Sequence, residues 1–439
     1  MIIARARLHG YRIAIVVAAA ATLLSAPAHA QKGAPAEHWV ATWSAAMHGQ
    51  FSFAGRSAPN ESFDDQTVRM IVHTSIGGRR ARVRLSNLFG TAPLAIGSAH
   101  IALRSKAGSI VPASDRALTF SGKASFAIPP GALALSDPVD LDVPQLGDLA
   151  ISVFVTSKTE APTWHSTGLQ TTYVAGPGDF TGKTDISDAA KQPSWYWISG
   201  VDVLAPDGTV AVVAFGDSIT DGARSTVDAN RSWPSDLARR LFARSGNVPQ
   251  LAVLNEGISG NRILHDMIGP NALARFDRDV LVQCGVADVI ILEGINDIGF
   301  SNIPNVPGAA EQAVTADELI AGLRQLVERA HVRGIRVFGG TLTPFDGATY
   351  YSAESEAKRQ AYNNWIRTSG AFDGVVDFDA AVRDPEHPSK ILPAYDSGDH
   401  LHPDDAGYQA MADAVELSLL APAPATGKVS AKKSGKAVK

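Results

Sequence analysis

The chain of 439 residues contains a single cysteine, Cys284. One thiol cannot form an internal disulfide, so disulfides do not hold this fold together. Export remains possible, because oxidising compartments permit disulfides but do not require them. A nucleophilic thiol is the alternative, but no motif surrounds Cys284. We expect a buried or partly buried side chain with no part in the chemistry.

Long apolar runs are also scarce. The best candidate, residues 13–24, is shorter than the roughly 20 residues that cross a bilayer as a helix. Arg5, Arg7 and Arg12 precede it, and Ala28-His29-Ala30 gives a small-x-small cleavage pattern. These features predict a signal peptide at residues 1–30, cleaved near Ala30. We therefore expect a secreted or periplasmic mature protein without a transmembrane segment.

The folded part has no basic stripe. The formal net charge is -5, although three arginines fall in residues 1–30 and five lysines follow Ala421, with no acid in either segment. The segment between them is therefore more acidic than the total suggests, which argues against nucleic acid as a partner. Residues 422–439 are poor in aromatic and branched side chains, and we expect a disordered Lys-rich tail. It is either a tether to an anionic envelope surface or a solvated extension.

Apolar residues make up 45% of the chain and charged residues 19%, which is enough for a sizeable core. Such a length suggests two or more domains. In residues 31–206 apolar and polar side chains alternate, as in residues 68–74 and 81–86, and the glycine turn between these two runs predicts a hairpin. The pattern predicts an all-β accessory domain, a sandwich or jelly roll. Further strand-like runs lie at 100–103, 118–120, 149–155, 171–174 and 201–204.

In residues 207–421 strands alternate with helices, which predicts a parallel sheet with helices on both faces. We expect helices at 232–244, closed by Gly246, around 319–327, and at 404–420 with Asp404 as the N-cap. The strands expected after the one that ends at Gly216 are 251–254, 289–292, 335–338 and 375–378.

The most informative stretch is Gly216-Asp217-Ser218, which follows a short apolar strand. Open α/β sheets have their active-site crevice at the carboxyl ends of the strands, so the hydroxyl of Ser218 is placed to be a nucleophile. A serine needs a base and oxyanion donors to act as one. Blocks that contain such groups follow in order: Gly257-Ile258-Ser259-Gly260, then Gly294-Ile295-Asn296, then Asp399-His400-Leu401-His402.

Each block also has a plainer interpretation. Gly257 and Asn296 could serve ordinary turns, since glycine tolerates positive φ and asparagine bonds local backbone. His400 and His402, with nearby aspartates, could form a metal site if they alternate on an extended segment. No second cluster of ligands appears in the sequence, so we expect no metal and no other cofactor, and we take His400 as structural or solvent-facing.

The four blocks resemble the SGNH/GDSL hydrolase (esterase and lipase) superfamily over roughly residues 210–420. The resemblance implies a three-layer, flavodoxin-like domain in which Ser218 is the nucleophile, His402 the base and Asp399 the residue that orients the base. It also implies an oxyanion hole formed by Ser218, Gly260 and Asn296. One departure is Ile219, where the family usually has leucine, and this aliphatic exchange conserves volume.

The resemblance implies a carboxylic ester hydrolase that works through an acyl-enzyme intermediate. We expect a small-molecule or polysaccharide ester as substrate, with a short-chain or acetyl group, and carbohydrate is one candidate for the alcohol. Fold alone leaves alternatives open: a lipid or aryl esterase, a lysophospholipase, or an acyltransferase. A carbohydrate-binding surface protein with an idle hydrolase domain is the non-enzymatic alternative.

Overall fold

The computed structural model describes residues 37–53, 56–57, 61–244, 249–303 and 308–420. The expected signal peptide, the Lys-rich tail and Gly246 lie outside the described residues. The described residues from His38 onward belong to one compact unit. Among the described residues no helix has the length and apolar character needed to cross a membrane.

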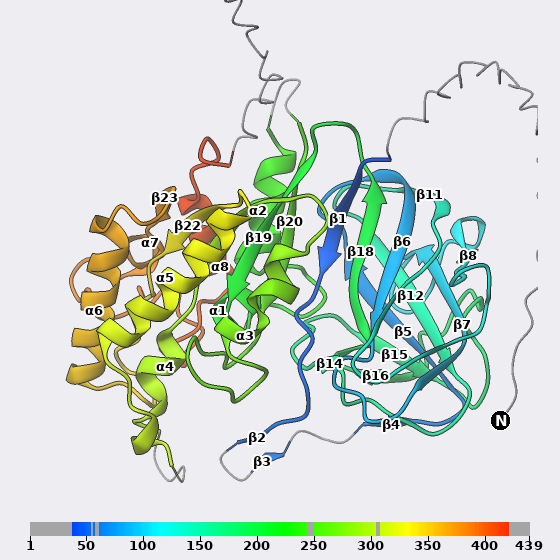
Figure 1. The fold of residues 1–439 in the computed structure, drawn as a ribbon, viewed down its shortest axis with the longest axis horizontal. Helices are drawn as coiled ribbons and strands as arrows, with labels where there is room; N and C mark the ends of the chain where they lie inside the picture. Colours follow the sequence, from blue (N-terminus) through cyan, green and yellow to red (C-terminus); the bar gives the residue numbers. More distant parts are fainter. Residues whose placement is uncertain (1–36, 54–55, 58–60, 245–248, 304–307, 421–439) are drawn as a thin grey trace, which may run out of the picture. The chain divides into compact units, whose positions relative to one another are not determined.

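The part before residue 207 is built from two main antiparallel sheets, as expected for a β-sandwich (Figure 1). The smaller sheet has the order β1-β18-β6-β10, and β11 also pairs with β6. Its strands are β1 (Trp39–Ser44), β6 (Gly78–Ser86), β10 (Leu133–Leu135), β11 (Val139–Val143) and β18 (Ile198–Leu204).

The larger sheet has the order β16-β15-β5-β12-β7-β8, with β9 paired to β7. Its strands are β5 (Gln66–His73), β7 (Leu94–Leu103), β8 (Arg116–Ala117), β9 (Phe126–Ile128), β12 (Asp148–Val155), β15 (Thr172–Ala175) and β16 (Ala190–Gln192). Short two-residue strands complete this part: β2 (Ser52–Phe53), β3 (Arg56–Ser57), β4 (Ser62–Phe63), β13 (Thr159–Glu160), β14 (Trp164–His165) and β17 (Trp195–Tyr196), with the 3-10 helix η1 (Pro112–Ser114).

The predicted hairpin is wrong. β5 pairs with β12 and β15, whereas β6 pairs with β18, β10 and β11, so the two strands lie in different sheets. The chain crosses between the sheets because Thr74 and Ser75 bond outward instead of closing a turn. The hydroxyl of Thr74 donates to the carbonyl of Pro144 at 2.7 Å and that of Ser75 to Thr42 at 2.7 Å. The strand-like run 118–120 is also not a strand, since β8 ends at Ala117 and Phe120 forms only an isolated bridge.

The part from residue 207 has one parallel sheet of order β20-β19-β21-β22-β23, the flavodoxin-like order that the resemblance implied. Its strands are β19 (Val210–Gly216), β20 (Leu251–Gly257), β21 (Val286–Leu292), β22 (Arg336–Gly340) and β23 (Gly374–Val376). The helices are α1 (Ser218–Asp221), α2 (Trp233–Phe242), α3 (Ala272–Phe276), the π-helix η2 (Asp277–Leu281), α4 (Ile295–Phe300), the 3-10 helix η3 (Ala310–Gln312), α5 (Ala316–Val332), α6 (Ala353–Thr368), α7 (Phe378–Val382) and α8 (Asp405–Ala414).

The helices cover both faces of this sheet (Figure 1). α3, α5 and α6 pack in sequence against one another, whereas α2 and α7 pack on α8. Right-handed crossovers require this division, because the chain moves from β19 to β20 in one direction and from β20 to β21 in the other. Asp404 caps α8 as expected, by accepting from the amide of Gly407 at 2.9 Å.

Several element ends differ from the prediction: β20 continues to Gly257 and β22 to Gly340, and α2 ends at Phe242. β23 stops at Val376 because Asp377 caps the next helix, its carboxylate accepting from the amide of Ala380 at 3.1 Å. The last helix ends at Ala414 instead of residue 420.

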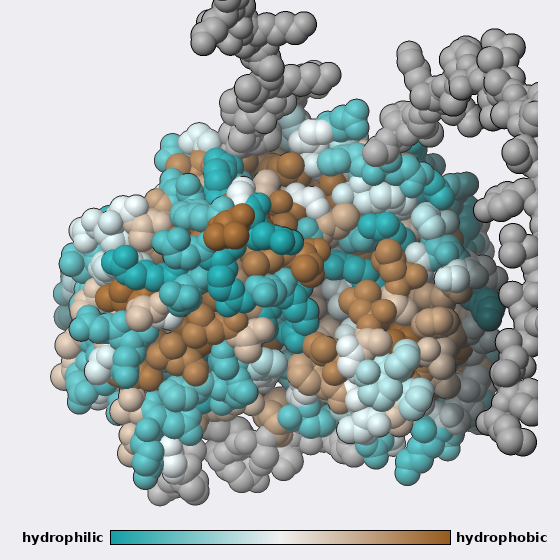
Figure 2. All heavy atoms as spheres, in the orientation of Figure 1, coloured by the Kyte–Doolittle hydropathy of each residue, from teal (hydrophilic) through white to brown (hydrophobic). Residues whose placement is uncertain are grey.

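One hydrophobic core runs through both parts of the chain. It contains Val40 and Val83 from the β sheets and Val212 and Leu254 from the parallel sheet, and β1 lies directly against β20. Figure 2 shows a surface that is mostly hydrophilic on this face, with separate apolar patches. The division into an accessory domain at 31–206 and a hydrolase domain at 207–421 stays a prediction.

Candidate active site

Ser218 lies where the topology of the parallel sheet reverses. β19 ends at Gly216 between β20 and β21, and the chain turns at once into α1, of which Ser218 is the first residue. Asp217 caps this helix by accepting from the amide of Ile219 at 2.9 Å. Ligands bind at this kind of position in open α/β sheets, because the loops after neighbouring strands diverge there.

The three residues predicted to form the catalytic triad are joined by hydrogen bonds. Ser218 Oγ lies 2.7 Å from His402 Nε2, and His402 Nδ1 lies 2.8 Å from Asp399 Oδ2. A carboxylate only accepts hydrogen bonds, so Nδ1 carries the imidazole proton and Nε2 is free to accept from the serine hydroxyl. This tautomer lets the histidine act as a base toward Ser218.

Asp399 is held in its ionised form. Partial burial opposes ionisation, but hydrogen bonds from the His402 side chain and from the amides of Leu401 and His402 outweigh it, so the pKa of Asp399 lies well below its usual value. Arg224 also donates from Nε to Asp399 Oδ2 at 3.0 Å. This exposed arginine, with a φ of 74°, escaped the sequence analysis because it belongs to no motif.

His400 and His402 face different partners. His400 has a φ of 61°, which breaks the extended alternation that the metal interpretation assumed, and its Nδ1 lies 2.5 Å from Asp396 Oδ2. Its side chain is 54% exposed, in keeping with the solvent-facing role expected for it. Within the described ranges, no three His, Cys, Asp or Glu side chains are grouped so as to hold a metal ion.

Gly260 has a left-handed backbone conformation, which glycine adopts more easily than other residues. Its φ is 80°, and a Cβ there would lie 2.8 Å from Cδ1 of Ile268. No acceptor bonds its amide within the described part of the chain. The N–H is therefore available to a ligand.

Asn296, near the start of α4, is oriented by two neighbours. Its Nδ2 donates to the carbonyl of Asn261 at 3.0 Å, and its Oδ1 accepts from the hydroxyl of Tyr350 at 3.4 Å. The amide nitrogen has two hydrogens, so one remains for another acceptor. The bond to Asn261 places Asn296 beside the loop that carries Gly260. Tyr350 had no signal in the sequence.

Two carboxylates hold this loop at its ends. Asp221 Oδ2 accepts from the amide and the hydroxyl of Ser259, at 3.1 and 2.7 Å. Asp297 accepts from the amides of Ile263 and Leu264, at 2.7 and 3.0 Å, and burial raises its pKa to about 6. Both aspartates lie in the sequence motifs, three residues after Ser218 and one after Asn296, but their role depends on where the loop returns.

Cys284 is partly buried and lies outside this site. Its Sγ donates to the carbonyl of Trp39 at 3.0 Å, and burial raises the pKa of the thiol. A raised pKa leaves less of the reactive thiolate, in keeping with the absence of a motif around it.

Residues 214–410 match the model of the GDSL-like lipase/acylhydrolase family. The chain carries a GDSL-like lipase/acylhydrolase domain. The matched region includes Ser218, Gly260, Asn296, Asp399 and His402. The match supports a hydrolase that acts on esters.

Solved structures similar to this chain include a catalytic mutant of an acetylxylan esterase from Geobacillus stearothermophilus, with 24% identity, 48% of this chain and 94% of that chain covered, and a TM-score of 0.37. A GDSL-like lipase from Bacteroides thetaiotaomicron has 21% identity over 48% of this chain and 87% of its own, with a TM-score of 0.35. A member of the lipolytic GDSL family from Veillonella parvula has 18% identity over 47% of this chain and 95% of its own, with a TM-score of 0.33. No curated protein matches the chain.

Proposed function

We propose that the protein is an exported serine esterase that removes short acyl groups, acetyl above all, from a polar alcohol such as a carbohydrate. The observation that carries this proposal is the continuous hydrogen-bonded series Ser218–His402–Asp399 at the carboxyl end of β19. Ser218 is the nucleophile, His402 the general base and Asp399 the residue that orients the imidazole.

The reaction proceeds in two halves. His402 Nε2 takes the proton of Ser218 as Oγ attacks the ester carbonyl, and the tetrahedral intermediate collapses when His402 returns that proton to the leaving alcohol. Water then attacks the acyl-enzyme, again with His402 as the base, and the acid and free Ser218 result. Asp399 stays ionised throughout and stabilises the imidazolium that forms in each half.

Negative charge develops on the carbonyl oxygen, and three donors are available to it. They are the amide of Ser218, at the first position of α1 where no intrahelical partner exists, the amide of Gly260 and the remaining hydrogen of Asn296. Donors held in place before the reaction lower the barrier because no reorganisation is needed when the charge appears.

The few exposed apolar side chains that follow α1 favour a short acyl group. A long acyl chain needs an exposed apolar surface near the nucleophile. Among the described residues, only one large exposed apolar side chain lies on the loop after α1, Val227. The others lie directly before η1, on β10, at the ends of α2 and α5 and after η2: Val111, Leu133, Leu135, Phe242, Val332 and Val282.

The decisive experiment uses Ser218→Ala with a chain-length series of p-nitrophenyl esters beside acetylated xylan, mannan and peptidoglycan. The variant should fold as the wild type does and lose about 10⁴-fold or more in kcat. A serine-directed phosphonate should label Ser218 in the wild type only. Unchanged turnover by the folded variant would overturn the assignment, and a preference for long-chain esters would favour the lipase alternative.

A further inference from the structure

A buried histidine of the β sheets lies next to the catalytic helix. His165 belongs to β14, which pairs with β17, and its side chain is 3% exposed. Its Nε2 lies 3.0 Å from Oδ1 of Asp221, the last residue of α1. The contact joins the β part of the chain to the helix that begins with Ser218.

Both ring nitrogens of His165 face acceptors. Nε2 faces the Asp221 carboxylate, and Nδ1 lies 2.9 Å from the carbonyl oxygen of Ala46. A neutral imidazole has one N–H, so both bonds form only if the ring is an imidazolium. Burial opposes the charge, but the Asp221 carboxylate and the Ala46 carbonyl more than offset it, and the pKa of His165 is raised.

The neighbouring histidine is neutral, which isolates the charge on His165. His48 Nε2 accepts from the amide of Ser166 at 3.1 Å, and the two imidazole centroids are 6.1 Å apart. Burial and the charge of His165 lower the pKa of His48 to about 3. Asp221 is therefore the group that balances the imidazolium.

Asp221 transmits this contact to the loop that carries Gly260. While Oδ1 faces His165, Oδ2 accepts from both the amide and the hydroxyl of Ser259. Ser259 directly precedes Gly260. Without the His165 imidazolium, the negative charge of the buried Asp221 carboxylate would be unbalanced. Reorientation of this carboxylate toward solvent would then be favourable.

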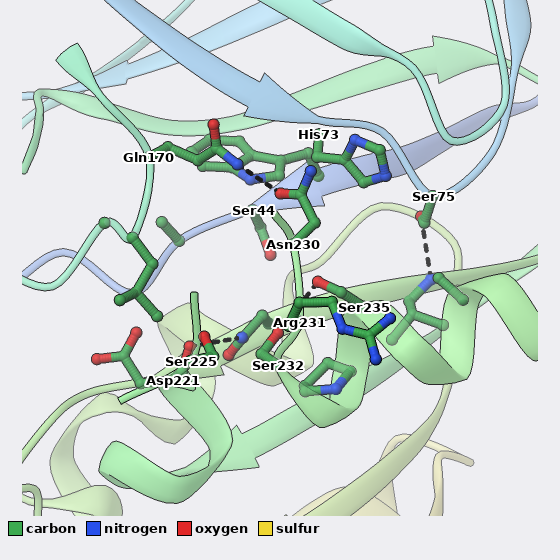
Figure 3. A pocket seen from close by; sticks show the side chains of 18 of the residues that line it. Ser44, His73, Ser75, Gln170, Asp221, Ser225, Asn230, Arg231, Ser232 and Ser235 are labelled. Atoms are coloured by element: carbon green, nitrogen blue, oxygen red, sulfur yellow. Dashed lines mark hydrogen bonds between the residues drawn. The ribbon is translucent and has the colours of Figure 1, made fainter. Parts of the chain in front are cut away.

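Room for such a movement exists beside the pair. Both His165 and Asp221 line a cavity of about 80 Å³ between the β sheets and α2. Figure 3 shows Asp221 at one side of this cavity, which Ser225, Ser232 and Asn230 also line. A cavity of that size admits water, which would solvate a released carboxylate.

We propose that His165, as a buried imidazolium, is a positioning residue for the oxyanion hole, holding Asp221 so that Ser259 keeps the Gly260 amide aimed at the reacting carbonyl oxygen. The β part of the chain thus completes the catalytic centre without touching substrate. This inference rests on the proposed function, which phosphonate labelling of wild-type Ser218 tests separately.

The test compares His165→Gln and Ser259→Ala with the wild type. Sites are first counted by phosphonate titration, so that kcat refers to folded enzyme only. We expect kcat on p-nitrophenyl acetate to fall about 10- to 100-fold, less than the 10²–10³-fold typical of losing a direct donor, for which Asn296→Ala is the reference. KM should stay unchanged, and affinity for a trifluoromethyl ketone, which forms a tetrahedral oxyanion on serine, should fall in proportion to kcat.

Because both substitutions act through Asp221, the double variant should lose less than the product of the two single losses. His100→Gln is the matched control: His100 pairs with Asp115 at 3.0 Å within the β part, and no bond from it to the part after residue 207 is seen among the described residues. It should leave kcat unchanged. If His165→Gln yields no titratable sites, Ser259→Ala decides alone. Wild-type kcat per titrated site, an unchanged ketone affinity, or fully multiplicative losses would each overturn the proposal.

Discussion

At the scale of single residues, the two histidines of the last motif differ in what their rings contact. His402 bonds Ser218 and Asp399, whereas the ring of His400 bonds Asp396 and no other described residue. His402→Ala should therefore lower kcat by about 10⁴-fold or more, and His400→Ala should retain most of the activity.

The measurement is the initial rate of p-nitrophenyl acetate hydrolysis, with His400→Ala as the matched control two residues away. Equal losses of kcat in the two variants would contradict the triad and would favour a shared role of the two imidazoles. Inactivation of the wild type by chelators would do the same.

At the scale of elements, α1 and β20 lie so close together that position 257 has no room for a side chain. A Cβ on Gly257 would lie 2.3 Å from the backbone nitrogen of Asp221 and 2.7 Å from its Cα. These atoms belong to the catalytic helix and cannot move aside without displacing Ser218. The glycine is thus required by packing, and the turn interpretation considered for it is incomplete.

Gly257→Ala should lower the free energy of unfolding by about 1–3 kcal/mol, as overpacking usually does, and should reduce kcat per titrated site. Gly370→Ala is the control, because Gly370 has a φ of 67° but nothing lies within 4 Å of its Cβ position. It should cost about 1 kcal/mol from the left-handed backbone and leave kcat unchanged. Denaturant unfolding and steady-state kinetics measure both effects. A fully active Gly257→Ala variant would show that α1 can shift without harm.

At the scale of the whole molecule, the β part and the parallel sheet share more than a linker. Ala41 donates to the carbonyl of Cys284 at 2.9 Å, Val253 donates to Ser75 Oγ at 3.1 Å, and one core continues between them. Deleting residues 31–206 should therefore give a protein that aggregates or has lost activity even on p-nitrophenyl acetate. If the deletion variant is soluble, monomeric and fully active on this small ester, the β part is an independent module, such as a polysaccharide anchor.

Stability should also depend on pH through the carboxyls buried near the sheet junction. Burial, and then the charge of Asp279, raise the pKa of Glu256 from 4.5 to about 8. As pH rises between these values, the unfolded chain loses this proton while the folded protein keeps it, so the free energy of unfolding decreases with pH. Above pH 8 both states are ionised and this contribution no longer changes.

Glu256→Gln should make the decrease between pH 4.5 and 8 shallower, because the amide cannot ionise and its oxygen can still accept from Gln283, as Glu256 does at 2.9 Å. Asp217 and Asp297, whose pKa values are raised to about 7 and about 6, leave a residual slope in the variant. Urea unfolding of both proteins at several pH values measures the slope of the free energy of unfolding against pH. An identical slope in both proteins would mean that Glu256 is ionised in the fold.

The sequence by itself determined the fold class of both parts and predicted the residues of the proposed triad. These depend on local features, a strand that ends in Gly216-Asp217-Ser218 and an aspartate three residues before His402, which a linear pattern can report. Only the tertiary structure decided which strands pair and what supports the site. β5 and β6 lie in different sheets because Thr74 and Ser75 bond to distant carbonyls. His165, on a two-residue strand of the β part, reaches Asp221 only when the β part and the parallel sheet share one core. No spacing in the sequence therefore predicts that contact.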